Sequence, residues 1–257
     1  MKIESLEQAL EPIFWEYINK DIPHHYFFAF DWKYNRDVTK ILLALEENRI
    51  NGIMLVYRQF IVQLRGSREA VKALLERLDL EKVELQSLEQ HKQYVLEKYK
   101  PTISHTMMLM LLRKGEEIRQ IKHPIITLDA SDAEQIATIM KDADPEFWGT
   151  TTSQQIVDGM STGVNWLGIK VDEELVSIGN RRLTELGGLI GVVATHEAHR
   201  NKGYATSIVS ELVMQILEKA STAMIYVLSD NPPAIRAYEK VGFKRHRTYF
   251  FMRGERC

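Results

Sequence analysis

Residues 192–206, Val-Val-Ala-Thr-His-Glu-Ala-His-Arg-Asn-Lys-Gly-Tyr-Ala-Thr, decide the fold of this chain. The apolar run Leu189–Ala194 predicts a strand buried on both faces. A basic turn follows, in which Gly203 lets the backbone turn tightly and approach a ligand. Apolar residues then recur at helical spacing over 208–217, which predicts a helix. Because the first amides of a helix lack intrahelical partners and its dipole is positive there, this turn predicts a phosphate or pyrophosphate site.

A second pattern lies about 30 residues downstream, the separation that a strand–loop–helix unit requires. It reads Asn-x-x-Ala-x-x-x-Tyr-x-x-x-Gly-Phe. Asp230 or Asn231 can cap a helix in whose first turn proline is tolerated. Gly242 suits a left-handed C-cap, and Phe243 would anchor the chain in the core. The matching residues are Asn231, Ala234, Tyr238, Gly242 and Phe243.

In this order, Arg200-x-x-Gly203-x-Ala205 and the downstream pattern resemble the acyl-CoA site of the GNAT superfamily of N-acetyltransferases. The resemblance covers about residues 122–257, and the turn is most similar to the subgroup that includes glycine N-acyltransferase-like enzymes. It implies an α/β (α+β) fold of the GNAT type, a mixed sheet flanked by helices. It also implies acetyl-CoA, or another acyl-CoA, as co-substrate and no metal.

The resemblance further implies roles for individual residues. The backbone of Val193, Ala194 and Thr195 would pair with the pantetheine arm, and the amide of Val193 or Ala194 would stabilise the oxyanion. Tyr238 would be the general acid, because a phenol is protonated at neutral pH and can donate to a thiolate. The alternative is that Tyr238 only packs one helix face. The expected cofactor-binding residues are Val193, Ala194, Thr195, Arg200, Asn201, Lys202, Gly203, Tyr204, Ala205, Thr206 and Asn231.

The general base stays unassigned. Some members of the superfamily use a glutamate on the strand before Asn231, where this sequence has Tyr226. Glu185, His196 and Glu197 are candidates by their proximity to the strand end, and solvated surface residues are the alternative. Three aromatic residues would either line an acceptor pocket or belong to the core, namely Phe147, Trp148 and Trp166.

Two other readings of residues 196–203 fail on spacing. A P-loop needs a glycine five residues before Gly203, and none is there. His196-Glu197-Ala198-His199 is one residue short of the zinc-protease motif, so its histidines do not share a helical face. A single cysteine also excludes a zinc site made of thiolates.

Composition places the chain among ordinary globular proteins, with 257 residues, 45% hydrophobic and 26% charged. With a net charge of −2, the chain has no overall positive potential that would attract nucleic acid, so we expect no nucleic-acid partner. The one cysteine, Cys257, fits a reducing compartment. The longest apolar run, Met107–Leu112, is far below the ~20 residues of a membrane span. Residues 1–14 lack the apolar core of a signal peptide, so we expect a cytoplasmic protein without membrane partners.

The charged connector Lys114–Lys122 predicts a boundary between an N-terminal domain, 1–114, and a catalytic GNAT domain, 122–257. The element order of the first domain is similar to the second half of a GNAT fold. Where the phosphate turn should stand, residues 64–70 keep only Gly66 of the motif. We therefore expect a degenerate GNAT-like half without CoA, and an unrelated α+β domain is the alternative.

Periodicity and turn residues predict the elements of both domains. In the first, helices are expected over 1–20, 35–47, 67–78 and 88–99, and strands over 22–34, 52–57, 60–64, 82–85 and 105–112. In the second, a capping box at Ser131–Glu134 opens a helix to about Lys141, and a second helix covers Thr152–Met160. A hairpin, 166–171 with 175–183, precedes the strand at residue 189.

The favoured function is an N-acetyltransferase that acts on a primary amine of a small-molecule or amino-acid-like acceptor, by direct attack in a ternary complex. A protein or peptide N-acetyltransferase is one alternative. A non-catalytic acyl-CoA-binding sensor module is another, and the missing base favours it. A homodimer is also compatible with the sequence, because the edge strands of a mixed sheet can pair between two copies of the chain.

Overall fold

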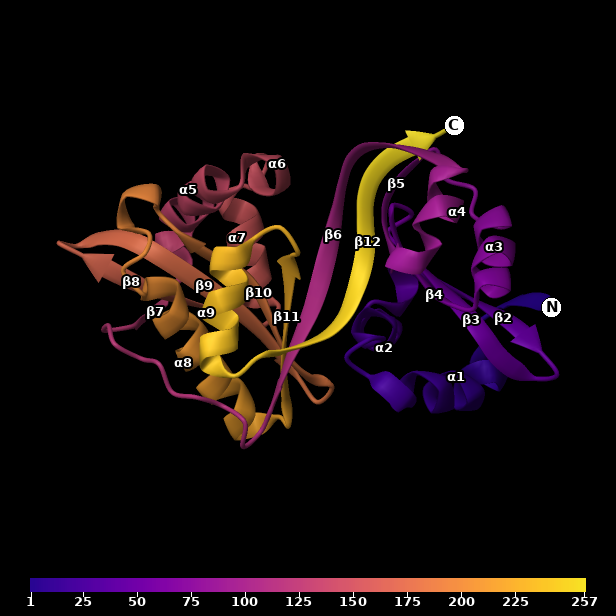
Figure 1. The fold of residues 1–257 in the computed structure, drawn as a ribbon, viewed down its shortest axis with the longest axis horizontal. Helices are drawn as coiled ribbons and strands as arrows, with labels where there is room; N and C mark the ends of the chain where they lie inside the picture. The colour runs from indigo at the N-terminus through magenta and orange to yellow at the C-terminus, as the bar shows by residue number, and fades with distance from the viewer. The chain divides into compact units, whose positions relative to one another are not determined.

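The computed structural model describes all residues 1–257, which form two compact units (Figure 1). The first comprises Met1–Leu109, Leu228–Asp230 and His246–Cys257, and the second comprises Met110–Val227 and Asn231–Arg245. Each unit is a mixed sheet flanked by helices. The C-terminal segment thus belongs to the first unit. No helix combines the length and the apolar character needed to cross a membrane.

The sheet of the first unit has the strand order β1-β2-β3-β4-β5-β12-β6. Strands β1 to β4 pair antiparallel with their neighbours, β4 pairs parallel with β5, and β5 pairs antiparallel with β12. The strands are β1 (Lys2–Ser5), β2 (Thr39–Glu46), β3 (Arg49–Tyr57), β4 (Ile61–Gly66), β5 (Lys82–Leu88), β6 (Tyr99–Arg113) and β12 (Lys244–Arg256).

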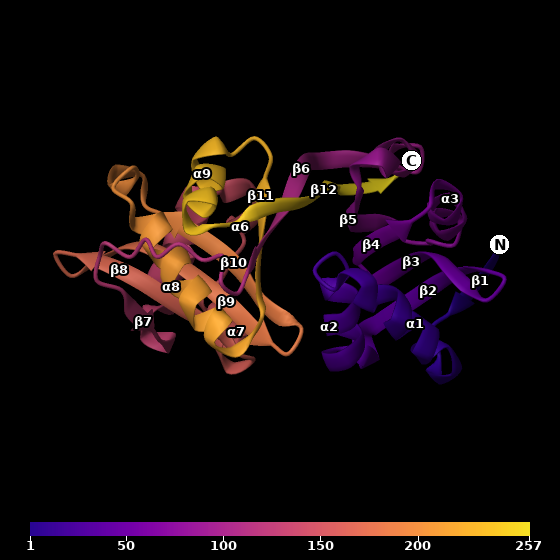
Figure 2. The same ribbon diagram turned by 60° about the horizontal axis from the view of Figure 1, so that its bottom comes forward.

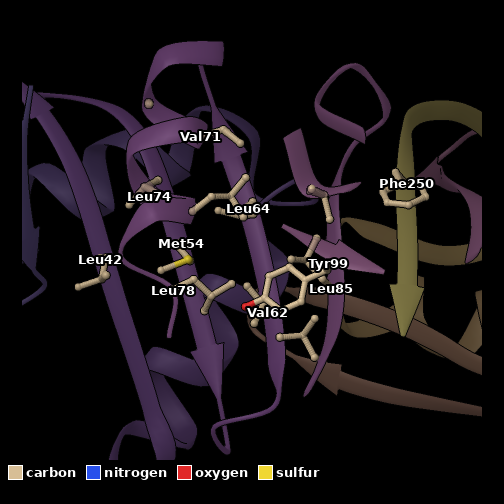
Figure 3. Packing of buried hydrophobic residues seen from close by; sticks show 14 of the residues in the cluster. Leu42, Met54, Val62, Leu64, Val71, Leu74, Leu78, Leu85, Tyr99 and Phe250 are labelled. Carbon is tan, nitrogen blue, oxygen red and sulfur yellow. The ribbon is translucent and has the colours of Figure 1, made fainter. Parts of the chain in front are cut away.

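The helices of the first unit are α1 (Glu11–Ile18), α2 (Tyr26–Tyr34), α3 (Arg68–Glu76) and α4 (Lys92–Leu96). α3 packs on β2, β3 and β4, whereas α1 contacts β3 and α2 contacts β2. A buried apolar cluster gathers residues of β2 to β5, α3 and β12 (Figure 3). Phe250 of β12 lies in this cluster with Leu85 and Tyr99, so the C-terminal strand contributes to the core of the first unit.

Two predictions in the first half are wrong. Residues 22–34 contain a helix, α2, because their buried positions fall at helical spacing even though aromatic residues favour strands. Residues 39–46 form a strand, β2, and not a helix. The run Ile41–Leu45 is buried at every position, as a strand covered on both faces requires.

Two predicted helices have different bounds. Only Glu11–Ile18 of residues 1–20 is α-helical, since Lys2–Ser5 pairs with β2 as strand β1. Residues 88–99 hold only the short α4, and Tyr99 already begins β6. The predicted hairpin β3–β4 and the helix capped by Ser67 are confirmed, with the Ser67 side chain accepting from the amide of Ala70.

The sheet of the second unit has the order β6-β11-β10-β9-β8-β7, and β10 pairs antiparallel with β9 but parallel with β11. Its helices lie on both faces (Figure 2), with α8 on β8 to β10 and against α9, and α5 on β9, β10 and α7. The strands are β7 (Ile126–Leu128), β8 (Val164–Val171), β9 (Glu174–Thr184), β10 (Gly187–Thr195) and β11 (Thr222–Leu228). The helices are α5 (Ala133–Ala143), α6 (Pro145–Trp148), α7 (Ser153–Ser161), α8 (Tyr204–Lys219) and α9 (Pro232–Val241).

The predicted hairpin and helices of the second half are confirmed, with one correction. The capping box that opens α5 is formed by Asp129 and Asp132, two residues before the expected pair, ahead of a short 3-10 turn. Glycines set the distance between α8 and the sheet. A Cβ on Gly179 would lie 2.5 Å from Ile208 Cγ2. Helix α8 can therefore pack this close to β9 only because residue 179 is glycine.

Candidate functional site

Strand β10 parts from β11 in the middle of its length. It pairs with β11 only over Gly188–Ile190, whereas its pairing with β9 continues to Thr195. The register on β9 shifts between Ile190 and Val193, which marks a bulge. Beyond Ile190, therefore, one backbone edge of β10 is not used by the sheet.

The bulge is built from Gly191 and Asn180. The Asn180 Oδ1 accepts a hydrogen bond of 3.1 Å from the amide of Val192, in the place of a strand carbonyl. A Cβ on Gly191 would lie 2.4 Å from that Oδ1, so a larger residue here would displace Asn180 from its bond to Val192. The Asn180 side chain therefore holds β10 against β9 at the point where β10 leaves β11.

The bonds around the bulge show which backbone groups face the free edge. The Val192 amide points to β9, and so does the Ala194 carbonyl, which accepts a 3.1 Å bond from Ser177 Oγ. In an antiparallel pair, successive residues direct their backbone groups to opposite sides. Hence the N–H and C=O of Val193 face the edge that β11 does not cover, and those of Ala194 do not. Of the two predicted oxyanion donors, only Val193 has this orientation.

The turn after β10 leads to the N-terminus of α8. It contains a 3-10 turn, Glu197–His199, and two left-handed residues, Asn201 (φ +65°) and Gly203 (φ +85°). The first intrahelical bond joins the Ser207 amide to the Gly203 carbonyl at 3.0 Å. The amides of residues 204–206 precede it, and the N-cap glycine has no side chain to satisfy them. A 16-residue helix thus presents free donors at its positive end.

The basic side chains of the turn are exposed. Arg200 lies back across the turn, and its Nε donates to the Thr195 carbonyl at 3.3 Å. The carbonyl of Lys202 accepts a 2.9 Å bond from His123 Nε2, and the His123 ring meets Tyr204 edge-on at 4.5 Å. His123 was missed by the sequence interpretation, because it lies about 80 residues before the turn and belongs to no local motif.

The start and end of α9 agree with the downstream pattern. Asn231 Oδ1 accepts from the amide of Ala234 at 3.2 Å, which confirms the cap, and Gly242 ends the helix at φ +113°. Tyr238 is only 6% exposed, and its ring lies 6.2 Å from Phe243. Burial raises the pKa of the Tyr238 hydroxyl above its usual value, so the phenol stays protonated.

The three candidates for the general base lie at different ends of β10. Glu185 lies in the turn before β10 begins, at the opposite end of the strand from Thr195, so its expected proximity is wrong. His196 and Glu197 follow β10 directly. Trp166 is 3% exposed and belongs to the core beneath α5, and Trp148 packs against that core. No group of three or more His, Cys, Asp or Glu side chains could hold a metal ion.

Comparison with known proteins agrees with this geometry. Residues 166–252 match the family model of the FR47-like protein. No curated protein matches the chain. Among solved structures, a Drosophila protein superposes with a TM-score of 0.73 at 11% identity, covering 97% of this chain and 98% of its own. A GNAT acetyltransferase from Colwellia psychrerythraea gives 0.63 at 12% identity, covering 99% and 100%.

A tandem GNAT protein from the clavulanic acid biosynthesis pathway gives a TM-score of 0.52 at 12% identity, covering 84% of this chain and 82% of its own. An overlap of this extent includes parts of both units. The chain therefore has the fold of the GNAT acetyltransferases, and residues 166–252 match the FR47-like family model.

Proposed function

We propose that the second unit transfers an acyl group from acetyl-CoA to a primary amine of a small-molecule or amino-acid-like acceptor, by direct attack in a ternary complex. One observation carries the proposal. The free backbone edge of β10 runs directly into the turn 196–203 and the unsatisfied amides of α8. A ligand with an amide-containing arm and a pyrophosphate fits such a continuous pair of sites, and acyl-CoA has both groups.

The backbone supplies most of the cofactor contacts in this proposal. Val193 and Thr195 pair with the pantetheine arm as a neighbouring strand would, while the amides from Asn201 to Thr206 bind the pyrophosphate. Arg200 and Lys202 add charge at the same turn. Asn231, whose Oδ1 already caps α9, has its side-chain NH₂ left for the cofactor. When the amine attacks, the Val193 amide donates to the oxyanion.

The leaving thiolate requires a proton or a hydrogen bond, which we assign to Tyr238. A CoA thiol has a pKa of about 8.5, and a lysine-like amine has one of about 10.4. The raised pKa of the Tyr238 hydroxyl keeps it protonated over the range in which the amine becomes neutral. The hydroxyl can therefore donate to the departing sulfur throughout that range. Full transfer of its proton would be uphill, so hydrogen bonding to the sulfur is the larger contribution. The attacking nitrogen gives its proton to water, and the sulfur leaves as a thiolate that Tyr238 hydrogen-bonds.

A second candidate function is an acyl-CoA sensor without catalysis. It is favoured by the absence of an assigned base, because Tyr226 stands where some relatives have glutamate and Glu185 lies at the wrong end of β10. In this reading the same edge and turn bind acyl-CoA, and Val193 has no oxyanion to stabilise.

The test combines binding and turnover. Acetyl-CoA at 100-fold its Kd should stabilise the fold by about 2.7 kcal/mol, which thermal unfolding would detect. Free thiol is then followed with acetyl-CoA and a panel of amino acids, small amines and peptides. Turnover of small amines supports the proposal, and turnover of peptides alone supports a peptide acetyltransferase. Binding without turnover supports the sensor, and no stabilisation at millimolar acetyl-CoA excludes all three.

A further inference from the structure

The connector, residues 114–122, is bonded to α9 at Ile118 and to α8 at its last residues. The amide of Gln120 donates to Ser210 Oγ at 2.9 Å, and the amide of Lys122 donates to Ser207 Oγ at 3.1 Å. Ser207 Oγ donates in turn to the Gln120 carbonyl at 3.3 Å. Both serines are fully buried, so their hydroxyls need these partners. The connector is therefore an ordered part of the second unit and delivers the next residue, His123, to a fixed place.

His123 lies against three consecutive residues, Lys202, Gly203 and Tyr204. Its Nε2 donates to the Lys202 carbonyl at 2.9 Å, and its ring contacts Tyr204 edge-on at 4.5 Å. Between these two, a Cβ on Gly203 would lie 3.7 Å from the same Nε2. The Lys202 carbonyl can only accept, so the His123 Nε2 carries a proton in this contact.

The bond to Lys202 fixes the direction of a donor on the other side of the peptide. The Lys202 carbonyl and the Gly203 amide belong to one planar trans peptide, in which C=O and N–H point in opposite directions. A carbonyl held by His123 therefore turns the Gly203 N–H away from His123. Gly203 is the N-cap of α8, so this N–H joins the free amides of residues 204–206.

We propose that His123 is a positioning residue for the pyrophosphate of acyl-CoA. It fixes the Lys202–Gly203 peptide so that the Gly203 amide faces the anion. The inference rests on the proposed function, because it deepens the same site. It extends that site to a residue outside both motifs and outside the FR47-like segment 166–252. Without His123 the left-handed turn would still form, but this peptide would be free to rotate.

The experiment compares His123→Ala with His123→Gln, which keeps an N–H donor at similar reach. The matched control is Gln120→Ala, because Gln120 is bonded to α8 only through its backbone. Calorimetry measures the affinity for CoA and for ADP, which retains the pyrophosphate. Loss of one hydrogen bond predicts that His123→Ala weakens both by about fivefold. His123→Gln and Gln120→Ala should stay within about twofold of the unchanged protein.

Two further readouts separate positioning from a general structural role. The KM for acetyl-CoA should rise in His123→Ala with kcat unchanged, while acetyl-pantetheine, which lacks the pyrophosphate, keeps its KM. With CoA bound, amide hydrogen exchange at Gly203 should be faster in His123→Ala than in the unchanged protein, and restored in His123→Gln. Equal CoA affinity in His123→Ala, or a Gln variant as weak as the Ala variant, overturns the proposal.

The proposed function and this inference can fail separately. If the unchanged protein binds neither CoA nor ADP, the proposed function is excluded, and the positioning of the anion falls with it. If the unchanged protein binds CoA and His123→Ala binds it equally well, only the role of His123 is excluded. Unchanged exchange at Gly203 in CoA-bound His123→Ala would likewise exclude the role of His123.

Discussion

Each unit has a strand that pairs antiparallel with the strand before it and parallel with the strand after it, and that leads into a helix. In the first unit these are β4 and α3, and in the second β10 and α8. The two differ in how the strand reaches the helix. β4 ends at Gly66 and Ser67 is already the N-cap of α3, whereas residues 196–203 separate β10 from α8.

The start of α3 is closed to a ligand. Ser67 Oγ accepts from the Ala70 amide at 3.2 Å, and the Gly66 carbonyl bonds with His91 Nε2 at 3.1 Å. Gly66 also packs directly against the backbone of Gly52, so no ligand backbone could approach. The start of α8 has a glycine cap and free amides instead. A helix N-terminus can bind an anion only when its donors are left unused.

The arginines of the two regions show the same difference. Arg200 is exposed on its turn, while Arg65 of β4 is fully buried. Arg65 Nε, Nη1 and Nη2 donate to oxygens of the protein, and no donor is left for a ligand. The acceptors belong to His24, Gln63, Leu64 and Gln86. The first unit therefore repeats the strand–helix arrangement of the proposed site, but without free donors at the start of its helix.

The largest effect is expected on kcat, in a comparison of α9, which follows β11, with α4, which follows β5. Tyr238→Phe in α9 should lower kcat about 100-fold, as loss of a hydrogen bond to a charged sulfur does, with the affinity for acetyl-CoA unchanged. Tyr94→Phe in α4 is the matched control, because Tyr94 packs on the core of the first unit. Steady-state thiol release measures both. A kcat within twofold in Tyr238→Phe would remove the acid role.

The pH dependence of the unchanged enzyme tests the same hydroxyl. Because the pKa of Tyr238 is raised, its protonated form persists to higher pH than an ordinary phenol. The rate should therefore rise with pH as an amine of pKa about 10.4 loses its proton, without a descending limb below about pH 10. A decline between neutral pH and about pH 9 would indicate that Tyr238 is not the donor.

A smaller effect is expected at the two glycines. Gly203→Ala forces an alanine into φ +85° and places a methyl group at the turn, which should weaken CoA binding about 30-fold. Gly66→Ala, at φ +135° and against the backbone of Gly52, should instead lower the free energy of unfolding by about 2 kcal/mol. Calorimetry and urea unfolding give both quantities for each variant. If Gly66→Ala is folded and its affinity for CoA is also reduced, the two glycines do not differ in their roles.

The arginine comparison should give a still smaller effect. Arg200→Ala should weaken CoA binding about tenfold through the loss of a charge-assisted bond, and added salt should reduce the difference. Arg68, exposed at the start of α3, is the matched residue, and Arg68→Ala should leave CoA affinity unchanged. Calorimetric titrations of both variants with CoA, at low and at high salt, measure these affinities. Equal losses in the two variants would point to a general charge effect and not to a site.

The smallest effect concerns the cap of α3. Ser67→Ala removes the bond to the Ala70 amide and should lower the free energy of unfolding by about 1 kcal/mol. The freed amide lies where Gly66 prevents approach, so no CoA binding should appear in the first unit. The binding stoichiometry should stay at one per chain in calorimetry. A second molecule bound would show that the cap alone closed the site.

The turn after β10 could be predicted because its information is local. Gly203, the basic residues and the periodicity of α8 follow one another in the sequence. The choice between Val193 and Ala194 could not be predicted, because it depends on the register with β9 and on the bulge at Asn180. His123 was also beyond reach, since only the path of the connector along α8 brings it to Lys202.

The error at residues 35–47 has a physical cause. Ile41–Leu45 is an unbroken apolar run, and such a run satisfies a helical and a strand pattern equally. The burial of each of its residues, which decides for a strand, depends on helices that pack from elsewhere in the chain. The pairing of β12 with β5 joins residues that are far apart in sequence, and no local signal announces it.

That pairing affects the order in which the molecule can form during synthesis. Residues 249–255 complete the sheet beside β5 and add Phe250 and Met252 to the core of the first unit. Domains usually fold in order as they leave the ribosome. Here the first unit must wait with the edge of β5 uncovered until the residues of β12 have been made. An exposed edge pairs readily with other chains, so the nascent protein should depend on a chaperone longer than its small units suggest.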